Sequence, residues 1–324
     1  MFRGIVLILG ACLVWGLFFI IPQFLVGFNT IEIVLGHYFF FGTISLCFML
    51  AKGIKRWTSL PSRIWMRAIL YAFVVNIFYY FSLVLGLRYA SASVTALIIG
   101  LSPITIAFYG NWRQKECSFK TLIQPSLLIG TGLILVNFKA FTELSAESVL
   151  EYTFGLGCGF LALIAWNWYV VSNSRFLKQN FSFPASDWST LIGVCTLLWV
   201  LIFGAGAIYF AEEEQMSKYF IFNDALMRFL IGSLILGLIC SWIGSYLWNS
   251  GSKFLPISLT GQLSIFETIF GLLFAYLVEQ RFPTGLETAG IATILGGVAL
   301  CMQIFRSPDF SLPLADPSPL ASLH

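Results

Sequence analysis

The sequence predicts an all-α polytopic membrane protein with ten transmembrane helices, arranged as two inverted five-helix repeats. Three observations lead to this prediction. The 324 residues are 58% hydrophobic and only 10% charged, whereas a soluble domain carries roughly 25% charged residues. Ten apolar segments are long enough to cross a bilayer, and a short motif recurs in the two halves of the chain. The composition excludes an ordinary water-soluble enzyme and a disordered or fibrous protein.

A helix needs about 20 mostly apolar residues to cross the hydrocarbon layer. The segments that meet this requirement are residues 4–22, 31–51, 68–86, 91–110, 121–138, 151–172, 187–210, 228–250, 256–278 and 285–304. They are continuously apolar and do not alternate as the strands of a membrane barrel do. Pro22 and Pro103 are expected to kink their helices. The glycine-rich runs 155–159 and 204–206 are expected to pack closely against neighbouring helices.

The distribution of basic residues predicts that both termini are cytoplasmic. With the N-terminus inside, thirteen of the eighteen lysines and arginines fall in cytoplasmic segments and five fall outside. Acidic residues collect outside, in the loops around residues 143–151 and 212–214. Basic residues are enriched in cytoplasmic loops of membrane proteins, so the split favours this orientation.

The recurring motif lies at an offset of 165 residues. Residues 86–95 (GLRYASASVT) align with residues 251–260 (GSKFLPISLT), so that glycine, base, aromatic and Ser-x-Thr positions coincide. The motif joins the third predicted helix to the fourth and the eighth to the ninth. Five helices in each half would insert the second half upside down, as in many transporters. The predicted division is a first repeat over 1–138, an extracytoplasmic linker over 139–150, a second repeat over 151–306 and a disordered tail over 307–324.

Several short motifs can be compared with a known family. They are Val14-Trp15-Gly16, the run 89–93 leading to Ser102-Pro103-Ile104, Glu116, and the segments 266–270 (FETIF) and 275–279 (AYLVE). With these motifs the sequence resembles the EamA-type members of the drug/metabolite transporter superfamily. Thr268 stands where the family has a proline, and His37 where many members have an arginine. The resemblance implies a protein that moves small organic solutes across a bacterial inner membrane.

Glu267 is the strongest candidate for a functional side chain, because it lies at the midpoint of the segment 256–278. A carboxylate at the bilayer centre costs about 2.5–3.5 kcal/mol on insertion scales, so it usually faces a cavity or a partner. Ser264 shares its helix face. We predict that both bind substrate and that Glu267 also couples protons; the alternative for Glu267 is a structural glutamate that clamps helices. His37, which titrates near neutrality, is a second candidate for proton coupling, or a hydrogen-bonded packing residue.

Aromatic and amide side chains on shared helix faces are further candidates for substrate binding. They are Trp166 and Tyr169, then Trp248 and Asn249, and finally Asn76, Tyr79 and Tyr80. Aromatic faces around a central carboxylate suit an amphipathic or cationic ligand. The alternative is that these aromatics belong to the belts that many membrane proteins have at the lipid interface.

The predicted function is secondary active transport of a small organic metabolite by alternating access. Export of an amino acid is favoured, because the pairs Trp166-Asn167 and Trp248-Asn249 resemble those of bacterial aromatic amino acid exporters in the superfamily. The alternatives are uptake of a quaternary ammonium compound, multidrug efflux and a non-transporting membrane scaffold. The expected partners are the substrate, a coupling proton and the lipid bilayer, and the expected state is a monomer or weak dimer.

Other functional classes lack support in the sequence. The two histidines and seven scattered cysteines form no metal-ligand pattern, and no glycine-rich loop suited to phosphate is present. The chain has no interfacial cluster of nucleophiles, so we do not expect an enzyme. We also expect no cofactor, and the net charge of +3 gives no reason to expect nucleic-acid binding.

Overall fold

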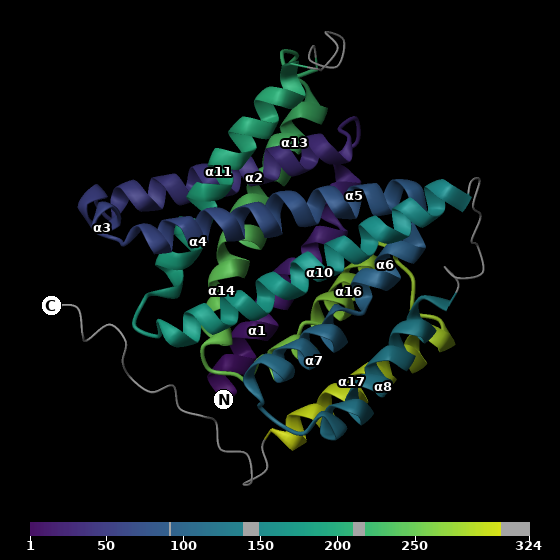
Figure 1. The fold of residues 1–324 in the computed structure, drawn as a ribbon. Helices are drawn as coiled ribbons and strands as arrows, with labels where there is room; N and C mark the ends of the chain where they lie inside the picture. Colours follow the sequence, from purple (N-terminus) through teal and green to yellow (C-terminus); the bar gives the residue numbers. More distant parts are fainter. Residues whose placement is uncertain (91, 139–148, 210–217, 306–324) are drawn as a thin grey trace, which may run out of the picture.

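The computed structural model describes residues 1–324 apart from 91, 139–148, 210–217 and 306–324. In the described part every regular element is helical (Figure 1). Nine of its helical segments are long and apolar enough to cross a membrane. The all-α, polytopic fold class is therefore confirmed. The predicted tail and most of the predicted linker lie outside the described residues.

The first part of the chain, up to residue 138, begins with a span over Phe2–Phe24 that starts as an α-helix and ends in two 3-10 turns. Its elements are α1 (Phe2–Trp15), η1 (Gly16–Phe19), η2 (Ile21–Phe24), α2 (Thr30–Ala51), α3 (Ile54–Thr58), α4 (Ser62–Ala72), η3 (Phe73–Phe78), α5 (Tyr79–Ala90), α6 (Ala92–Gly100), α7 (Ser102–Gln114) and α8 (Phe119–Val136). A capping box starts α2, because Asn29 and Glu32 each bind the backbone N–H of the other, at 2.9 and 2.7 Å.

The second part of the chain follows with longer helices. Its elements are α10 (Val149–Gln179), α11 (Ala185–Tyr209), α13 (Asp224–Ile235), η4 (Leu236–Ile243), α14 (Gly244–Ser252), α15 (Ile257–Leu263), α16 (Phe266–Glu279) and α17 (Gly285–Ile304). Thr284 and Glu287 form a second capping box at the start of α17. These boundaries agree with the predicted spans to within a few residues at most helix ends.

In the first predicted span, 4–22, α1 passes into the 3-10 turns η1 and η2, and Pro22 lies at the start of η2. Two other predicted spans are broken. The segment 91–110 is broken at Leu101, between α6 and α7, and Pro103 lies in the first turn of α7. Proline lacks an N–H and fits the first helical turn, so the predicted distortion at Pro103 is confirmed. The second span, 256–278, is broken at Ser264 and Ile265. There the Ser264 hydroxyl donates to Gly261 O at 2.7 Å.

Two further spans contain a π-helical stretch, η3 and η4. At each one a tryptophan from another helix donates to a backbone carbonyl. Trp199 binds Ile69 O at 3.1 Å, just before η3, and Trp15 binds Cys240 O at 2.9 Å, within η4. Side chains that insert into the helical hydrogen-bond ladder are a known cause of such irregular turns.

Glycine contacts show which helices approach most closely. An added Cβ would lie 2.4 Å from Ala90 N at Gly155, and 3.0 Å from Ile98 at Gly159. The predicted packing role is therefore confirmed for these two residues. It is wrong for Gly157, Gly204 and Gly206, where no described atom lies within 4 Å of the added Cβ. Gly204 and Gly206 lie near the end of α11, which extends beyond its neighbours at the top of Figure 1.

The long helices pair across the chain, as the neighbouring ribbons of α8 and α17 show in Figure 1. In the same way α2 packs on α11, α7 on α15, α1 on α14 and α5 on α10. Each of these pairs joins a helix before residue 138 to a helix after residue 149. The two parts of the chain therefore fold around each other.

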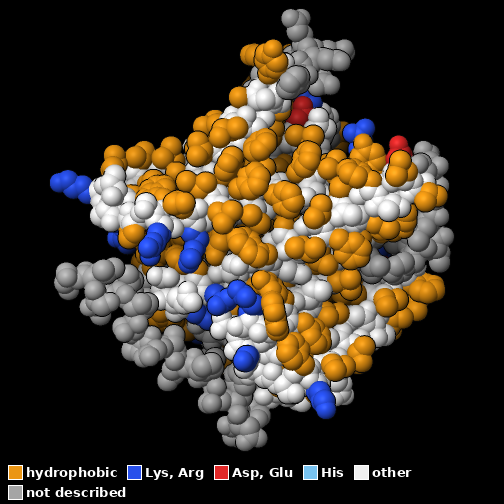
Figure 2. Space-filling view, in the orientation of Figure 1, with side chains coloured by type: hydrophobic (Ala, Val, Ile, Leu, Met, Phe, Trp, Pro, Cys, Tyr) orange, Lys and Arg blue, Asp and Glu red, His pale blue; other side chains and the backbone are white. Residues whose placement is uncertain are grey.

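Basic side chains gather at one end of the bundle (Figure 2). On the face drawn in Figure 2, hydrophobic side chains cover the middle, and lysine and arginine gather in the lower part of the view. We call this the basic end; it holds α3 and the ends of α7, α10 and α14, with Lys52, Arg56, Arg67, Lys178 and Lys253 among its residues.

Candidate substrate site

Glu267 lies in the first turn of α16, directly after the break in its span. Its backbone N–H donates to Ser264 O at 3.0 Å. Within the described part of the chain the carboxylate forms no hydrogen bond and no ion pair. The residue is deep in the bundle, yet part of its surface remains open. An unpaired carboxylate at this depth is the arrangement expected of a group that binds a ligand or a proton.

Residues from three other helices surround this carboxylate. Cys12 of α1 is close to it, and its thiol lies 3.6 Å from Leu263 O at the end of α15. Tyr79 of α5 and Cys240 of η4 also lie within electrostatic range of the carboxylate. The break in the helix thus places Glu267 where α1, α5 and η4 converge.

A cluster of aromatic rings adjoins the same region. Trp166 is its centre, with ring centroids 6.1 Å from Trp15, 5.6 Å from Tyr79 and 6.0 Å from Tyr169. Trp248 lies 5.1 Å from Trp15. These five residues, here called the aromatic cluster, come from α1, α5, α10 and α14. Because Tyr79 is near Glu267, the cluster and the carboxylate form one site.

The structure thus brings together four of the predicted aromatic residues: Trp166, Tyr169, Trp248 and Tyr79. Trp15 is the member that the sequence interpretation did not place in the site. It belongs to the motif Val14-Trp15-Gly16, so the signal was present in the sequence. Its contact with Trp248 joins positions 233 residues apart, and such a contact does not follow from helix periodicity.

Two polar atoms beside the aromatic cluster have no hydrogen-bond partner in the described structure. They are the indole Nε1 of Trp248 and the amide oxygen of Asn167. The amide nitrogen of Asn167 donates to Thr105 in α7 at 2.7 Å. Buried polar atoms usually have a partner, so unpaired ones next to a candidate site are available to a ligand or to water.

The other predicted polar residues are already bonded within the protein. The Asn249 amide accepts from Asn173 at 2.8 Å and donates to Ser189 at 2.9 Å, and it is fully buried. Asn76 donates to Thr196 at 2.7 Å. The Ser264 hydroxyl donates to the backbone carbonyl of Gly261, in the preceding helix α15. These three side chains shape the bundle around the site.

The remaining predicted residues, His37 and Tyr80, lie beside a different ring. Tyr38 is 3.8 Å from His37 and 6.5 Å from Tyr80, measured between ring centroids. The Nε2 atom of His37 lies 3.0 Å from the Ser241 hydroxyl, and the histidine is only 4% exposed. Tyr80 also lies within electrostatic range of Tyr79, so it adjoins the aromatic cluster. Among the described residues, no ring contact or hydrogen bond joins His37 directly to a member of that cluster. Nor do the described residues include a group of three or more potential metal ligands.

Comparisons with known proteins show what this chain is similar to. Residues 2–138 match the EamA-like transporter family. The chain is 29% identical over 308 residues to the inner membrane protein YtfF of Escherichia coli (strain K12), covering 94% of this chain and 96% of that protein. It is 22% identical over 228 residues to the uncharacterized transporter YyaM of Bacillus subtilis (strain 168), covering 70% and 69%.

A solved crystal structure of another protein has the same fold. Its TM-score is 0.73, its sequence identity is 17%, and the match covers 94% of this chain and 97% of that one. The family resemblance seen in the short motifs is confirmed by the match of residues 2–138 to the EamA-like transporter family.

Proposed function

We propose that this protein is a secondary active transporter that moves a small organic metabolite across a bacterial inner membrane by alternating access. The observation that carries the proposal is the unpaired Glu267 carboxylate beside the aromatic cluster, deep among membrane-length helices. The names of the relatives, an inner membrane protein and a transporter, support the location and the general activity.

Alternating access requires two halves that can move relative to each other, and several features support an inverted repeat. Broken spans occur at Leu101 and at Ser264, and π-helical stretches occur at η3 and η4. Lys115 and Gln280, which are 165 positions apart, both end their helices with positive φ, at 52° and 51°. This spacing equals the offset of the sequence repeat. On these grounds we keep the division into repeats 1–138 and 151–306, with five helices each. The proposal that both termini are cytoplasmic rests on the distribution of basic residues along the sequence.

The substrate is proposed to carry a positive charge and an apolar body. A carboxylate attracts an ammonium group, and aromatic faces add cation–π attraction of about 0.5–2 kcal/mol. An amino acid, an aromatic one especially, meets this description, and its export is the favoured activity. Quaternary ammonium uptake and multidrug efflux fit the same chemistry.

Flux into proteoliposomes tests the proposal, with a panel of aromatic and aliphatic amino acids and quaternary ammonium ions. We expect at least one class to be transported, and Glu267→Gln to reduce that flux by more than about tenfold, because one charged contact is worth roughly 1.5–3 kcal/mol. Glu279→Gln is the matched control, since Glu279 lies at the other end of α16 and is exposed. Its flux should equal that of the wild type.

Two outcomes would count against the proposal. Equal flux in wild type and Glu267→Gln would remove Glu267 from the mechanism. If no compound moved, the scaffold alternative would gain support. Cysteine labelling at Trp166→Cys distinguishes a transporter from a scaffold. A transporter should be labelled at this position, whereas a scaffold should not, because it has no path for water to the centre of the bundle.

A further inference from the structure

We propose that Glu116 and Asp187 form a latch that closes the basic end of the bundle and thereby holds the substrate site open to the opposite side. The inference rests on the alternating-access transport proposed above. Both carboxylates are nearly inaccessible, with side chains 4% and 2% exposed. Both bind groups from the other half of the chain, so their contacts must break when that end opens.

Glu116 lies in a turn that the protein holds in shape. Lys115 ends α7 in the left-handed conformation, with φ at 52°. The Asn111 side chain then binds both backbone groups of Cys117: it donates to the carbonyl at 2.9 Å and accepts from the N–H at 2.8 Å. The residues on either side of Glu116 are therefore held in position, and this positions its carboxylate toward the start of α15.

The Glu116 carboxylate binds the start of α15, which belongs to the second half. The carboxylate accepts hydrogen bonds from the backbone N–H groups of Ile257 and Ser258, at 2.5 and 2.8 Å. The first N–H groups of a helix have no partner within the helix, so an acceptor there is stabilising. Lys178, at the end of α10, lies 3.7 Å from the same carboxylate. One side chain of the first half is thus bound to two elements of the second.

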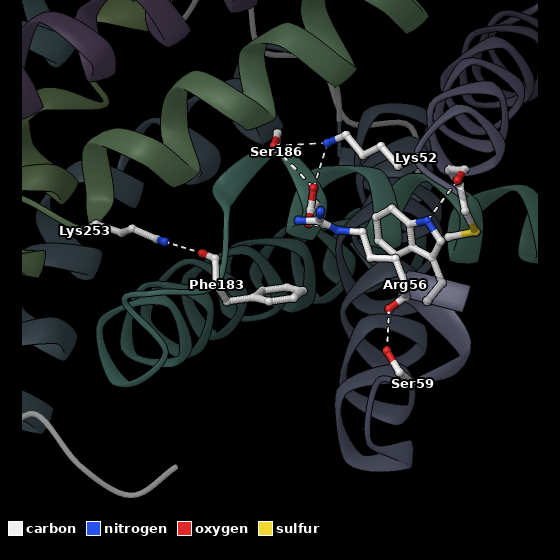
Figure 3. Close-up of polar contacts among 9 residues, drawn as sticks. Lys52, Arg56, Ser59, Phe183, Ser186 and Lys253 are labelled. Carbon is white, nitrogen blue, oxygen red and sulfur yellow. Dashed lines mark hydrogen bonds and ion pairs between the residues drawn. The ribbon is translucent and has the colours of Figure 1, made fainter. Parts of the chain in front are cut away.

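The second contact of the latch also joins the two halves. Here the carboxylate belongs to the second half and the groups that bind it belong to the first. Asp187, in the first turn of α11, accepts from Lys52 at 2.7 Å and from Arg56 Nε at 2.8 Å. Arg56 also reaches it through its terminal nitrogen. Figure 3 shows Lys52 and Arg56 converging beside Ser186, the neighbour of Asp187, which also lies 3.4 Å from Lys52.

Hydrogen bonds from two tryptophans hold the segment that carries Lys52 and Arg56 in position. The indole of Trp57 donates to Met49 O at 2.9 Å, and the indole of Trp65 donates to Trp57 O at 3.2 Å. On the other side, Lys253 donates to the carbonyls of Phe181 and Phe183, which shapes the turn before α11; Figure 3 shows the contact with Phe183. The segment of Lys52 and Arg56 and the turn that leads to Asp187 are therefore both held in place by hydrogen bonds.

The latch is connected to the proposed substrate site through one span. Glu116 holds the beginning of α15, and Glu267 lies in the first turn of α16, directly after the break that ends α15. Movement of α15 away from Glu116 would therefore shift the break at Ser264 and the carboxylate beyond it. This makes Glu116 a positioning residue, not one that touches the substrate.

The opposite end of the bundle offers a matched contact. Among the described residues there, Lys218 of the second half binds Glu32 of the first at 2.7 Å and the Gly27 carbonyl at 3.2 Å. In the described part of the chain, one carboxylate crosses between the halves at that end, whereas two do so at the basic end. Glu32→Gln should therefore weaken the opposite closure and serve as a control of opposite sign.

The experiment measures access to the site from each side of the membrane. Trp166→Cys and, as a second reporter, Tyr79→Cys are labelled with a membrane-impermeant maleimide in right-side-out and inside-out vesicles. Labelling is read by peptide mass spectrometry. With the latch intact, we expect labelling mainly from the side opposite the basic end. Glu116→Gln and Asp187→Asn should raise labelling from the basic end about tenfold, as loss of one charge-assisted contact predicts, and lower it from the other side.

The opposed changes distinguish a latch from simple loss of stability, which would raise labelling from both sides. Glu32→Gln should move both rates in the reverse direction. If the reporters are labelled but Glu116→Gln and Asp187→Asn leave both rates unchanged, the latch is wrong while the transport proposal stands. If neither reporter is labelled from either side in any variant, alternating access fails and the latch fails with it.

Discussion

His37 and Glu267 are the two titratable side chains predicted to handle protons, and the protein surrounds them differently. His37 has the Ser241 hydroxyl at 3.0 Å and the rings of Phe18 and Tyr38 nearby, with centroids at 5.5 and 3.8 Å. Glu267 has no bonded partner in the described structure. A buried polar group that already has a hydrogen-bond partner needs no further one. A buried polar group without a partner can bind a ligand, water or a proton. The contacts therefore favour a packing role for His37 and a functional role for Glu267.

Cys117 provides a prediction about pH at the basic end. Burial, and secondarily the charge of Glu116, raise the pKa of the Cys117 thiol to about 11, from a usual value of about 8.5. Only the thiolate reacts with maleimide. Below pH 11 the thiol stays mostly protonated, so labelling should be slow at pH 7 and rise about tenfold per pH unit up to pH 10. Timed labelling with peptide mass spectrometry measures this.

The control for this prediction is Glu116→Gln. Removing the neighbouring negative charge lowers the pKa of Cys117, so the thiolate fraction at a given pH increases and labelling at pH 8 should be faster than in the wild type. A labelling rate that levels off near pH 9 in the wild type, as for an ordinary exposed thiol, would contradict the raised pKa.

At the scale of helices, two adjacent glycines in α17 allow a matched test of close packing. A Cβ added at Gly297 would lie 2.8 Å from Pro125 O and 2.9 Å from Ile129, both in α8. At Gly296 no described atom lies within 4 Å. We expect Gly297→Ala to lower the free energy of unfolding by about 1–3 kcal/mol, the usual cost of overpacking, and Gly296→Ala to leave it unchanged or slightly higher. Thermal unfolding in detergent measures both; equal midpoints would mean that α8 and α17 do not pack this closely.

The helical elements differ in how well the sequence predicts them. Apolar length predicted the spans, and Pro103 predicted the irregularity near Leu101, because proline acts on the backbone locally. The break at Ser264 has a weaker signal, since glycine and serine also occur in continuous membrane helices. Gly204 and Gly206 show the converse error: a small-residue pattern indicates that a neighbour can approach, but not that one is present.

At the scale of the whole molecule, the site is built from contacts that periodicity cannot supply. Helix faces predicted that Trp166 and Tyr169 would lie together, because they belong to one helix. The proximity of Trp15 to Trp166, or of Tyr79 to Glu267, depends on how the two halves of the chain pack. That arrangement is decided by the pairing of long helices far apart in sequence, such as α1 with α14 and α5 with α10.

This pairing predicts how the chain behaves when it is divided. The pairs α2 with α11, α7 with α15 and α8 with α17 join the two halves, so either half alone would leave these closely fitting faces without a partner. We expect residues 1–144 and 145–324, co-expressed as separate polypeptides, to copurify through a tag on one of them. Expressed alone, each should be degraded or aggregate. A cut between Leu163 and Ile164, inside α10, is the matched control and should prevent assembly, because it interrupts a helix that packs on α5. If residues 1–144 alone were monodisperse and as heat-stable as the whole chain, the halves would be independent units, and the packing between them would not be what holds the fold together.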